Sequence, residues 1–570
     1  MSSRHPQLHF ILLLLTYYRP TYNAAKGSNG ITVQCLPDQA LSLLQLKHSF
    51  HNPDLSSWQH GTDCCHWEGV GCDRASGQVI TLDLSYRSLQ STGGLSSALF
   101  NLTSLRSLSL SGNDFNHASL PSFGFERLTE LLSLELSETG LSGQIPIGIA
   151  HLEKLLTLDI SYNDYLYLRE PQFQTLVANL TNLRDLYLNE VDISSSGPTW
   201  SVAIADSVPL LQNLDFNSLS TLKLRENRFH GMLPENIGEG CMLQTIDLNN
   251  NLIEGKIPRS LSNCQGLELF DVGNNQIIGS FPSWLGVLPR LRVLVLRFNQ
   301  LNGTIRDFKG DHTINNYFAN LQILDLASNN FSGNLPEGWF NELKAMMENV
   351  SDGGEVLGHE TYSGARFYQD TVTITFKGFD LSFTKILSTF NAIDFSNNSF
   401  DGPVPESIGR LVALRGLNMS YNNFMGQIPF QYRNLSQLEA MDLSWNQITG
   451  EIPQELTSLT SLEWLNLSYN NLYGRIPQGN QFSTFSDSSF EGNAGLCGVP
   501  LSKHCDNQSS ISPTGVAPPE SEGLWQDKLG IILFFAFVGL GFGVGFALSF
   551  LLRLYCRVEG WICKQAWIHM

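Results

Sequence analysis

The chain has 570 residues, of which 42% are hydrophobic and 15% charged, and its formal net charge at pH 7 is −19. This length can hold several globular domains or one long repeat array. The acidic balance excludes a general nucleic-acid binder, because no surplus of lysine and arginine is present to neutralise phosphates.

A short apolar segment near the start of the chain predicts secretion. Leu8–Leu15 follows Arg4 and His5 and is too short to cross a bilayer, but it suits the apolar part of a signal peptide. We therefore assign residues 1–25 to a signal peptide. The alternative is a buried strand at the N-terminus.

Eight of the ten cysteines fit an oxidising compartment. Four cluster within residues 26–78, a predicted N-terminal cap, two follow within the repeats, and two lie within residues 481–506, a predicted C-terminal cap. We expect disulfides among these eight, since a zinc site needs another spacing and a histidine pair. They are Cys35, Cys64, Cys65, Cys72, Cys241, Cys264, Cys497 and Cys505. Cys556 and Cys563 are expected to be reduced or palmitoylated.

The interior of the chain is a sequence repeat. Leu243, Ile246, Leu248 and Asn251 give the pattern L-x-x-L-x-L-x-x-N, and a Gly-x-Ile-Pro ending follows. The pattern restarts 24 residues further on, at Leu267. This period is typical of leucine-rich repeats. We therefore predict an α/β solenoid, in which leucine-rich repeats stack into a superhelix.

Each position of the repeat has a physical role. The leucines point inward from a short strand, and the asparagine binds backbone groups at the turn, so that stacked repeats form a ladder. The glycine permits the turn and the proline blocks helix continuation. A repeat cannot bury its own apolar face, so the end repeats need caps, and the cysteine clusters lie where caps are expected.

The repeat starts divide the chain. About ten repeats fill residues 79–340 and four fill residues 389–480, whereas residues 341–388 do not fit the pattern and are interpreted as an inserted island with a strand at Thr371–Phe376. The Ser- and Pro-rich residues 507–528 predict a flexible acidic stalk. The fourteen starts are Val79, Leu105, Leu131, Leu155, Leu183, Leu219, Leu243, Leu267, Leu291, Leu321, Phe390, Leu414, Leu438 and Leu462.

A second apolar segment predicts a membrane anchor. Gly530–Leu552 has 23 residues and no charge. At ~1.5 Å per residue such a helix crosses a ~30 Å hydrocarbon core, and we place it at residues 529–552. Acidic residues precede it and basic residues follow it in a short tail, residues 553–570, which the positive-inside rule places in the cytoplasm. The prediction is a single-pass type I protein of the plasma membrane with its N-terminus outside.

Ten Asn-x-Ser/Thr sites precede this segment and indicate a glycosylated extracellular surface. They are Asn101, Asn179, Asn302, Asn330, Asn349, Asn397, Asn418, Asn434, Asn466 and Asn507. Asn418 and Asn466 fall on the predicted strand face of the solenoid. Glycans at these two residues would obstruct that part of the face.

Several motifs together identify a family. The N-terminal cap contains Asp63–Trp67 (D-C-C-H-W), the repeats end as at Leu141–Pro146 (L-S-G-Q-I-P), the island contains Lys377 and Gly378 ahead of four repeats, and Asn493–Cys497 precedes the stalk. In this combination the chain resembles the plant leucine-rich-repeat receptor-like proteins, which are relatives of plant receptor kinases without a kinase domain. The likeness is to the disease-resistance members that perceive fungal products such as xylanase.

The resemblance implies more than a fold. It implies the cap disulfides Cys35–Cys64 and Cys65–Cys72, and defence signalling through a partner kinase; we expect no cofactor. Members of this family usually carry more repeats, so the array is a shortened one. The irregular stretch Asn189–Leu219 is the candidate position of the loss.

The solvent-facing strand positions line the concave face of the solenoid and are the first candidates for ligand recognition. We interpret the row at the fifth repeat position as solvated residues that shape the repeat: Lys223, Asp247, Asp271, Val295, Asp325, Asp394, Asn418, Asp442 and Asn466. Arg225, Arg297 and Phe298 replace the usual small residue beside the asparagine and are candidate ligand contacts. Three nearby aromatic residues are interpreted as structural: Tyr421, Trp445 and Tyr469.

The island is the second candidate. Long loops inside repeat arrays are usually functional or disordered. Tyr362, Arg366, Phe367 and Tyr368 combine aromatic rings with a cation, as interface anchors often do, and we interpret them as candidate ligand contacts. A folded spacer is the alternative.

The predicted membrane helix carries two overlapping Gly-x-x-x-Gly pairs, Gly539 with Gly543 and Gly541 with Gly545. Small residues at this spacing let helix backbones approach closely, although glycine is also common in membrane helices generally. We interpret these glycines as a pairing face. The resemblance implies that the partner is a single-pass adaptor receptor kinase.

No enzyme is predicted, because the tail is too short for a kinase and no kinase, hydrolase or metalloprotease motif occurs. Three interpretations remain. The chain is a receptor that binds an extracellular protein, peptide or glycan and acts through a partner kinase in plant defence, or an inhibitor of a pathogen wall-degrading enzyme, or a nonproductive decoy. The predicted membrane helix counts against the inhibitor.

Overall fold

The computed structural model describes residues 34–51, 53–169, 172–193, 219–306, 317–348, 359–360, 366–367, 370–387 and 389–505. The chain divides into two units, Met1–Cys505 and Asp506–Met570, and the second lies outside the described residues. So do the predicted signal peptide, stalk, membrane helix with its four glycines, and tail. Within the described ranges, no helix combines the length and the apolar character that a membrane span requires.

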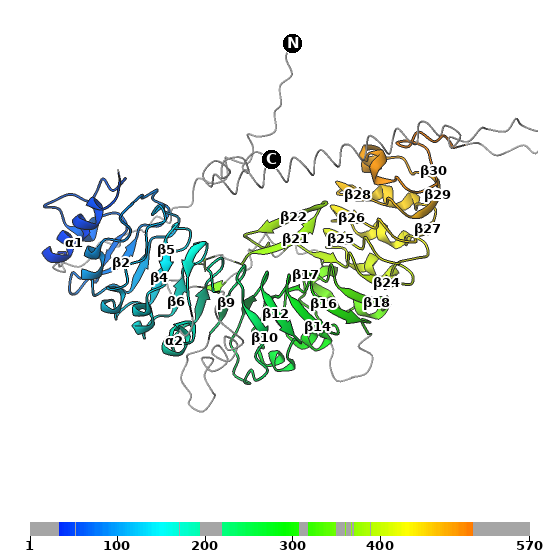
Figure 1. The fold of residues 1–570 in the computed structure, drawn as a ribbon. Helices are drawn as coiled ribbons and strands as arrows, with labels where there is room; N and C mark the ends of the chain where they lie inside the picture. The colour runs from blue at the N-terminus through cyan, green and yellow to red at the C-terminus, as the bar shows by residue number, and fades with distance from the viewer. Residues whose placement is uncertain are drawn as a thin grey trace, which may run out of the picture. The chain divides into compact units, whose positions relative to one another are not determined.

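A 15-stranded sheet runs through the first unit in the order of the chain (Figure 1). Its strands are β1 (Val70–Cys72), β2 (Val79–Asp83), β3 (Ser107–Ser109), β4 (Ser133–Glu135), β6 (Thr157–Asp159), β8 (Asp185–Tyr187), β9 (Thr221–Lys223), β11 (Thr245–Asp247), β13 (Leu269–Asp271), β15 (Val293–Val295), β17 (Ile323–Asp325), β23 (Ala392–Asp394), β25 (Gly416–Asn418), β26 (Ala440–Asp442) and β28 (Trp464–Asn466). β1 and β2 pair antiparallel, and the later pairs are parallel. Each predicted repeat start carries one strand. The sheet continues across the irregular stretch Asn189–Leu219, because β8 pairs with β9.

The leucine pattern forms the core. In the repeat that starts at Leu243, the side chains of Leu243, Ile246 and Leu248 are 4%, 5% and 1% exposed. Successive side chains of a strand point to opposite faces, so Asp247 lies on the other side of the sheet. Each repeat covers the apolar side of its neighbour, which produces one continuous core along the first unit.

The rest of each repeat forms shorter elements. A six-stranded parallel sheet contains β10 (His230–Met232), β12 (Leu252–Gly255), β14 (Gln276–Gly279), β16 (Gln300–Gly303), β18 (Asn330–Asn334) and β24 (Ser399–Asp401). Smaller sheets pair β5 (Ser142–Gln144) with β7 (Tyr165–Tyr167), and join β27 (Thr449–Gly450), β29 (Asn471–Arg475) and β30 (Gly495–Cys497). Short helices complete the repeats: η2 (Ser97–Asn101), η3 (Phe125–Arg127), η4 (Ile147–His151), α2 (Gln172–Asn179), η5 (Arg259–Asn263), η6 (Ser283–Val287), α4 (Glu337–Phe340), α5 (Lys344–Met347), η7 (Glu406–Arg410), η8 (Phe430–Asn434), η9 (Gln454–Ser458), η10 (Asn480–Thr484) and η11 (Asp487–Ser489).

The predicted asparagine ladder is confirmed. The Nδ2 of Asn251 donates to the carbonyl oxygens of Leu224 (2.9 Å) and Leu248 (3.0 Å), and its Oδ1 accepts from the backbone N–H of Phe229 (3.0 Å). Leu224 belongs to the preceding repeat, so each side chain satisfies buried backbone groups of two repeats. The same arrangement recurs at Asn275, Asn299, Asn329, Asn398, Asn422, Asn446, Asn470 and Asn493.

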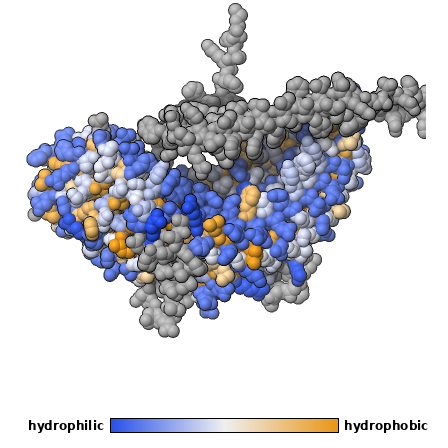
Figure 2. Space-filling view, in the orientation of Figure 1, coloured by the Kyte–Doolittle hydropathy of each residue, from blue (hydrophilic) through white to orange (hydrophobic). Residues whose placement is uncertain are grey.

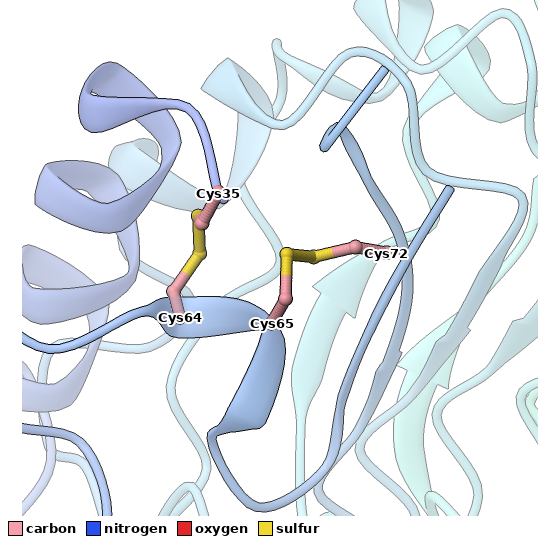
Figure 3. Close-up of side chains that lie close together, drawn as sticks. All are labelled: Cys35, Cys64, Cys65 and Cys72. Atoms are coloured by element: carbon pink, nitrogen blue, oxygen red, sulfur yellow. A yellow bond between two sulfur atoms is a disulfide. The ribbon is translucent and has the colours of Figure 1, made fainter. Parts of the chain in front are cut away.

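Disulfides lie in both caps. In the N-terminal cap they join the segment just before α1 (Pro37–His48) to η1 (Cys64–His66), and η1 to β1 (Figure 3). The four sulfurs there lie within 4.8 Å of one another, but they are bonded in pairs and leave no thiolate for a metal. The pairs implied by the resemblance are confirmed, and the other predicted cysteines are also paired. The bonds are Cys35–Cys64, Cys65–Cys72, Cys241–Cys264 and Cys497–Cys505.

Only part of the predicted island departs from the repeat core. Leu343 and Met346 are 0% exposed and belong to that core. The repeat core therefore extends beyond residue 341, where we expected the island to begin. Further on, β19 (His359–Glu360) pairs antiparallel with β20 (Arg366–Phe367). The island then forms an antiparallel hairpin.

This hairpin, which we call the island hairpin, consists of β21 (Val372–Phe376) and β22 (Phe379–Phe383). Its turn is Lys377 and Gly378, whose φ angles are 54° and 83°. Two-residue hairpin turns of type I′ require positive φ at both positions, which glycine adopts without strain. The predicted strand Thr371–Phe376 is thus one half of the hairpin.

Candidate functional site

One side of the 15-stranded sheet carries the row of aspartates at the fifth repeat position; we call this side, from Lys223 to Asn466, the aspartate face. Each aspartate closes the turn after its strand. The Oδ1 of Asp247 accepts from the N–H of Asn249 at 3.1 Å, and equivalent bonds form at Asp271, Asp325, Asp394 and Asp442. Asn418 and Asn466 accept the same bond. The expectation that the row shapes the repeat is confirmed.

The expectation that the row is solvated is wrong for its central part. Asp247, Asp271, Asp325 and Asp394 are 1%, 0%, 1% and 5% exposed. They are buried because the island hairpin lies across the aspartate face, as Figure 1 shows for β21 and β22 above β17. In a repeat array without such a hairpin this row would face solvent. Here it is buried between the sheet and the hairpin.

Apolar contacts hold the island hairpin on this face. Val372, Ile374 and Phe376 are 0%, 3% and 7% exposed, at every second position of β21. They pack against small and apolar residues of the aspartate face, namely Leu269, Val293, Val295, Ile323, Ala392 and Ala440. Most of β22 is exposed, and its Phe379 is 72% exposed. One strand of the hairpin therefore provides most of the packing.

Ion pairs hold the two ends of the island hairpin. At one end, the Nζ of Lys223 lies 2.9 Å from the Oδ1 of Asp370, just before β21. At the other end, the Nζ of Lys377 lies 3.2 Å from an oxygen of Glu439 and 2.6 Å from an oxygen of Glu463. The contacts of the hairpin thus extend from β9 to the start of β28.

Arg225, a predicted ligand contact, is instead an internal bridge. Its Nε lies 2.9 Å from the Oδ2 of Asp247 and its Nη2 lies 2.8 Å from the Oδ2 of Asp271. Its Nη1 donates to the Oγ1 of Thr373 in the island hairpin at 3.4 Å. Arg225 is 5% exposed and does not face solvent. Its role is therefore to join the aspartate face to the island hairpin.

Arg297, the second predicted contact, has a similar place. It is 4% exposed, its Nη2 lies 3.1 Å from the Oδ1 of Asp380 in the island hairpin, and its Nη1 lies 3.6 Å from the Oδ2 of Asp325. Its guanidinium also lies 4.8 Å from the ring centroid of Phe298. Phe298 is 44% exposed and stays a candidate for ligand contact.

The candidates in the island are only partly described. Arg366 and Phe367 form β20, and Tyr362 and Tyr368 lie outside the described residues. The island residues that the sequence did not single out are those that reach the aspartate face, above all Asp370 and Asp380. No periodic pattern marks them, because their partners lie far away in the chain.

A pocket remains between the island hairpin and the aspartate face. Its empty volume is about 450 Å³, which includes space that opens to solvent. One wall comes from Phe376, Lys377 and Gly378 of the hairpin and another from Trp464. The polar residues of its floor are Asp325, Asp394, Asn418 and Asp442. The pocket therefore combines aromatic walls with a floor of carboxylates.

Burial changes the acidity of this floor. Desolvation raises the pKa of Asp442 to about 6, and the nearby charge of Asp394 adds to the effect. Desolvation also raises the pKa of Asp394 and that of Asp325. In the first half of the face, desolvation raises the pKa of Asp271 to about 6 although Arg225 opposes it. The buried surroundings thus favour the protonated, neutral form of these carboxyl groups.

Replacing Asp442 by asparagine is expected to stabilise the fold near neutral pH. A carboxyl whose pKa is raised on folding, here from 3.8 to about 6, stabilises the fold below the lower value and loses that contribution as the pH rises through the higher one. Asparagine avoids this loss and keeps the turn contact, as Asn418 shows. Chemical denaturation should show a gain on the order of 1–3 kcal/mol at pH 7.5 that vanishes near pH 4. An equal gain at both pH values would contradict this cause.

The described glycosylation sites fall into two groups. Six are exposed: Asn101, Asn179, Asn302, Asn330, Asn397 and Asn434. Asn418 and Asn466 are partly buried on the aspartate face, and the Nδ2 of Asn418 donates to the Oδ2 of Asp394 at 3.0 Å. Asn349 and Asn507 lie outside the described residues. Occupancy of all ten sites stays a prediction.

Exposed apolar residues are scattered in small groups on the face that Figure 2 shows. A separate feature is the stack of Tyr421, Trp445 and Tyr469, whose ring centroids are 5.4 and 4.1 Å apart. These residues occupy the same position in three successive repeats, and each ring covers the face of the next. Stacking between repeats agrees with the structural role that we expected for them.

Comparison with known proteins adds the family. The family pattern described as "Leucine rich repeat N-terminal domain" matches residues 36–73. Patterns described as "Leucine rich repeat" match residues 241–301 and 429–472, and residues 320–341 and 461–492. These ranges cover the N-terminal cap and repeats on both sides of the island.

The relatives are plant proteins. The chain is 38% identical to Receptor-like protein Cf-9 of Solanum pimpinellifolium over 231 residues, which cover 37% of this chain and 25% of Cf-9. It is 39% identical to Receptor-like protein 53 of Arabidopsis thaliana over 491 residues, which cover 83% of this chain and 49% of that protein. The chain therefore spans a quarter to about a half of the length of these two relatives.

A solved structure supports the fold. The crystal structure of a TDR receptor superimposes with a TM-score of 0.51 at 24% identity, covering 72% of this chain and 67% of that chain. The match concerns the fold alone. The sequence relatives, together with the repeats and the N-terminal cap, show that the chain belongs to the plant leucine-rich-repeat receptor-like proteins.

Proposed function

We propose that this protein is a cell-surface receptor that binds an extracellular, pathogen-derived ligand and signals in plant defence through a partner receptor kinase. The observation that carries the proposal is the pocket between the island hairpin and the aspartate face. Its floor is built by repeats and one wall by the island, so a ligand there contacts both parts. Binding at such a composite site is sensitive to the placement of the hairpin.

The chemistry of the site favours recognition over catalysis. The described carboxylates of the floor serve as turn acceptors and lie beside aromatic rings, and the residues that line the pocket include no serine, cysteine or histidine. The relatives are named receptor-like proteins. Both points support a binding role for this chain.

The coupling to a kinase rests on the predicted membrane helix. Its glycines, Gly539, Gly541, Gly543 and Gly545, lie outside the described residues, so their role in pairing stays a prediction. Close approach of two helix backbones needs small residues, and leucine at these positions should block it.

Affinity purification of the tagged full chain from plant membranes tests the proposal. We expect a single-pass receptor kinase to co-purify with the parent and at least tenfold less with a variant in which the four glycines are replaced by leucine. The control carries Val538→Leu and Val544→Leu in the same segment and should retain the kinase. Quantitative mass spectrometry of the purified material measures both.

Two other outcomes point to the other interpretations. If the protein is glycosylated and present at the cell surface but no kinase co-purifies, signalling through a partner loses its support. Tight binding to a purified pathogen polygalacturonase would then favour the inhibitor. Failure of the chain to reach the cell surface would favour the nonproductive decoy.

A further inference from the structure

In the first half of the aspartate face, the carboxylates bind a guanidinium group. Arg225 lies between two strands and bridges Asp247 and Asp271 at 2.9 and 2.8 Å. A planar guanidinium suits this task, because its N–H groups form a fork that reaches carboxylates on neighbouring strands about 4.8 Å apart. Here the guanidinium comes from the chain itself.

In the pocket the same row of carboxylates lacks such a partner. Among the residues that the structure describes, neither Asp394 nor Asp442 has an ion-pair partner. The cations around them are engaged elsewhere: Arg297 with Asp325 and Asp380, Lys377 with Glu439 and Glu463, and Arg415 with Glu439. The pocket floor therefore contains two carboxyl groups that form no ion pair with a described cation.

Asp325 gives a second, independent indication. It is 1% exposed and lines the pocket, and its Oδ2 accepts no hydrogen bond from the described residues. Its cation, Arg297, stays 3.6 Å away at the closest nitrogen, and the Nη1 and Nε of Arg297 lack hydrogen-bond partners as well. A buried carboxylate oxygen without a donor is costly, and a ligand N–H satisfies it.

The row also keeps aspartate where asparagine would serve the fold. Asn418 and Asn466 accept the same turn hydrogen bond as Asp394 and Asp442, at 3.1, 3.2, 2.8 and 2.9 Å respectively. The second carboxylate oxygen accepts from an asparagine of the next repeat, from Asn418 at 3.0 Å in Asp394 and from Asn466 at 3.5 Å in Asp442. The turn itself therefore does not require the charge.

A metal ion does not fit this arrangement. Among the described residues, three or more ligand atoms within 4.8 Å of one another occur in the disulfide-bonded N-terminal cap and not at this floor. The carboxylates of the floor are spread over several strands, which suits an extended group with several donors. The indole of Trp464 in the wall offers a surface for such a cation.

We propose that the pocket binds an arginine side chain of the extracellular ligand, with the guanidinium on Asp394, Asp442 and the free oxygen of Asp325 and its flat face near Trp464. The inference deepens the proposed function, since it assigns the cation to a ligand of the receptor. It makes the recognised ligand a peptide or protein with an exposed arginine. The pocket is partly open to solvent, as entry of a ligand side chain requires.

The test uses a matched pair of probes on the full chain. N-acetyl-arginine amide carries the guanidinium, and N-acetyl-citrulline amide has nearly the same shape without the charge. We expect the arginine probe to bind with a dissociation constant on the order of 1 mM in calorimetry and ligand-observed NMR. The citrulline probe should bind at least tenfold more weakly.

Variants locate the binding. The double variant Asp394→Asn, Asp442→Asn should lose at least tenfold in affinity for the arginine probe and should remain folded, because asparagine keeps the turn contacts. Asp83→Asn changes the same repeat position outside the pocket and should bind as the parent does. Equal binding of both probes, or an unchanged affinity in the double variant, overturns the proposal.

A glycan provides a separate check. The pocket is lined by Asn418, which is also a predicted glycosylation site, so a glycan there would fill it. Peptide mapping of the purified chain should find Asn418 unmodified, and a mostly glycosylated Asn418 overturns the proposal. These measurements need no kinase. If the chain binds the arginine probe but no kinase co-purifies, the proposed signalling is contradicted and the arginine pocket is supported. If a kinase co-purifies but the arginine probe does not bind, only the arginine pocket is contradicted.

Discussion

Replacing Arg225 by methionine is expected to destabilise the folded chain by about 3–5 kcal/mol at pH 7.5. The change leaves Asp247 and Asp271, which are 1% and 0% exposed, side by side on paired strands without a cation. Their mutual repulsion and their lost solvation are then uncompensated. Removing one partner of a buried ion pair costs more than the pair contributed, because the remaining charge cannot regain water. Urea denaturation followed by circular dichroism measures the loss.

The pH dependence and companion variants identify the cause. Burial already raises the pKa of Asp271 to about 6 with Arg225 present, so its carboxyl in the variant takes up a proton on acidification, and the deficit should shrink between pH 7.5 and 5. Adding Asp247→Asn and Asp271→Asn to the variant should restore most of the stability. Lys154→Met removes an ion pair whose side chains are 54% and 45% exposed and should cost less than about 1 kcal/mol. A loss for Arg225→Met no larger than this would contradict the bridging role.

The repeat architecture could be predicted because its signals are local. Leu243, Ile246, Leu248 and Asn251 recur every 24 residues, and each has one role that depends on its own repeat and the next. Strand position, core side and asparagine ladder all follow from this period. The disulfide Cys241–Cys264 fits the same logic, since residues about one repeat apart lie on adjacent repeats.

The position of the island hairpin could not be predicted in this way. Its contacts join residues as far apart as Arg225 and Thr373, which are 148 positions apart. No periodicity links them, and the pairing depends on a three-dimensional fit between a hairpin and a sheet. The sequence marks Arg225 and Arg297 as departures from the repeat pattern but not their partners. A row of aspartates that a hairpin buries has the same sequence pattern as a solvated row.

The two halves of the aspartate face now have a common explanation. In the first half the chain supplies Arg225 and Lys223, and the face closes under the hairpin through internal ion pairs. In the second half the described cations pair with other carboxylates, and Asp394 and Asp442 remain in an open pocket. The hairpin is therefore both a cover for one half and a wall for the other, so its position controls the pocket.

Replacing Phe376 by alanine is expected to release the island hairpin from the aspartate face. Phe376 is 7% exposed, packs against Phe390 at 5.4 Å between ring centroids, and lies so close to Gly416 that a side chain there would touch its ring. Truncating a buried phenylalanine costs about 3–5 kcal/mol, and the small hairpin has few other apolar anchors to offset that loss. Hydrogen exchange of Val372–Phe383 should accelerate about a hundredfold or more, while the repeat core keeps its protection.

The control for this release is Phe379→Ala. Phe379 is the cross-strand partner of Phe376 in the same hairpin, but it is 72% exposed, so its loss removes hairpin surface without removing contact to the aspartate face. Its hydrogen exchange should stay within a few-fold of the parent. If Phe376→Ala also remains protected, the ion pairs of Lys223 and Lys377 hold the hairpin by themselves, and the apolar contact is secondary. If the hairpin is released, binding of the arginine probe should disappear with it, because the wall of the pocket leaves while every carboxylate of the floor stays in place.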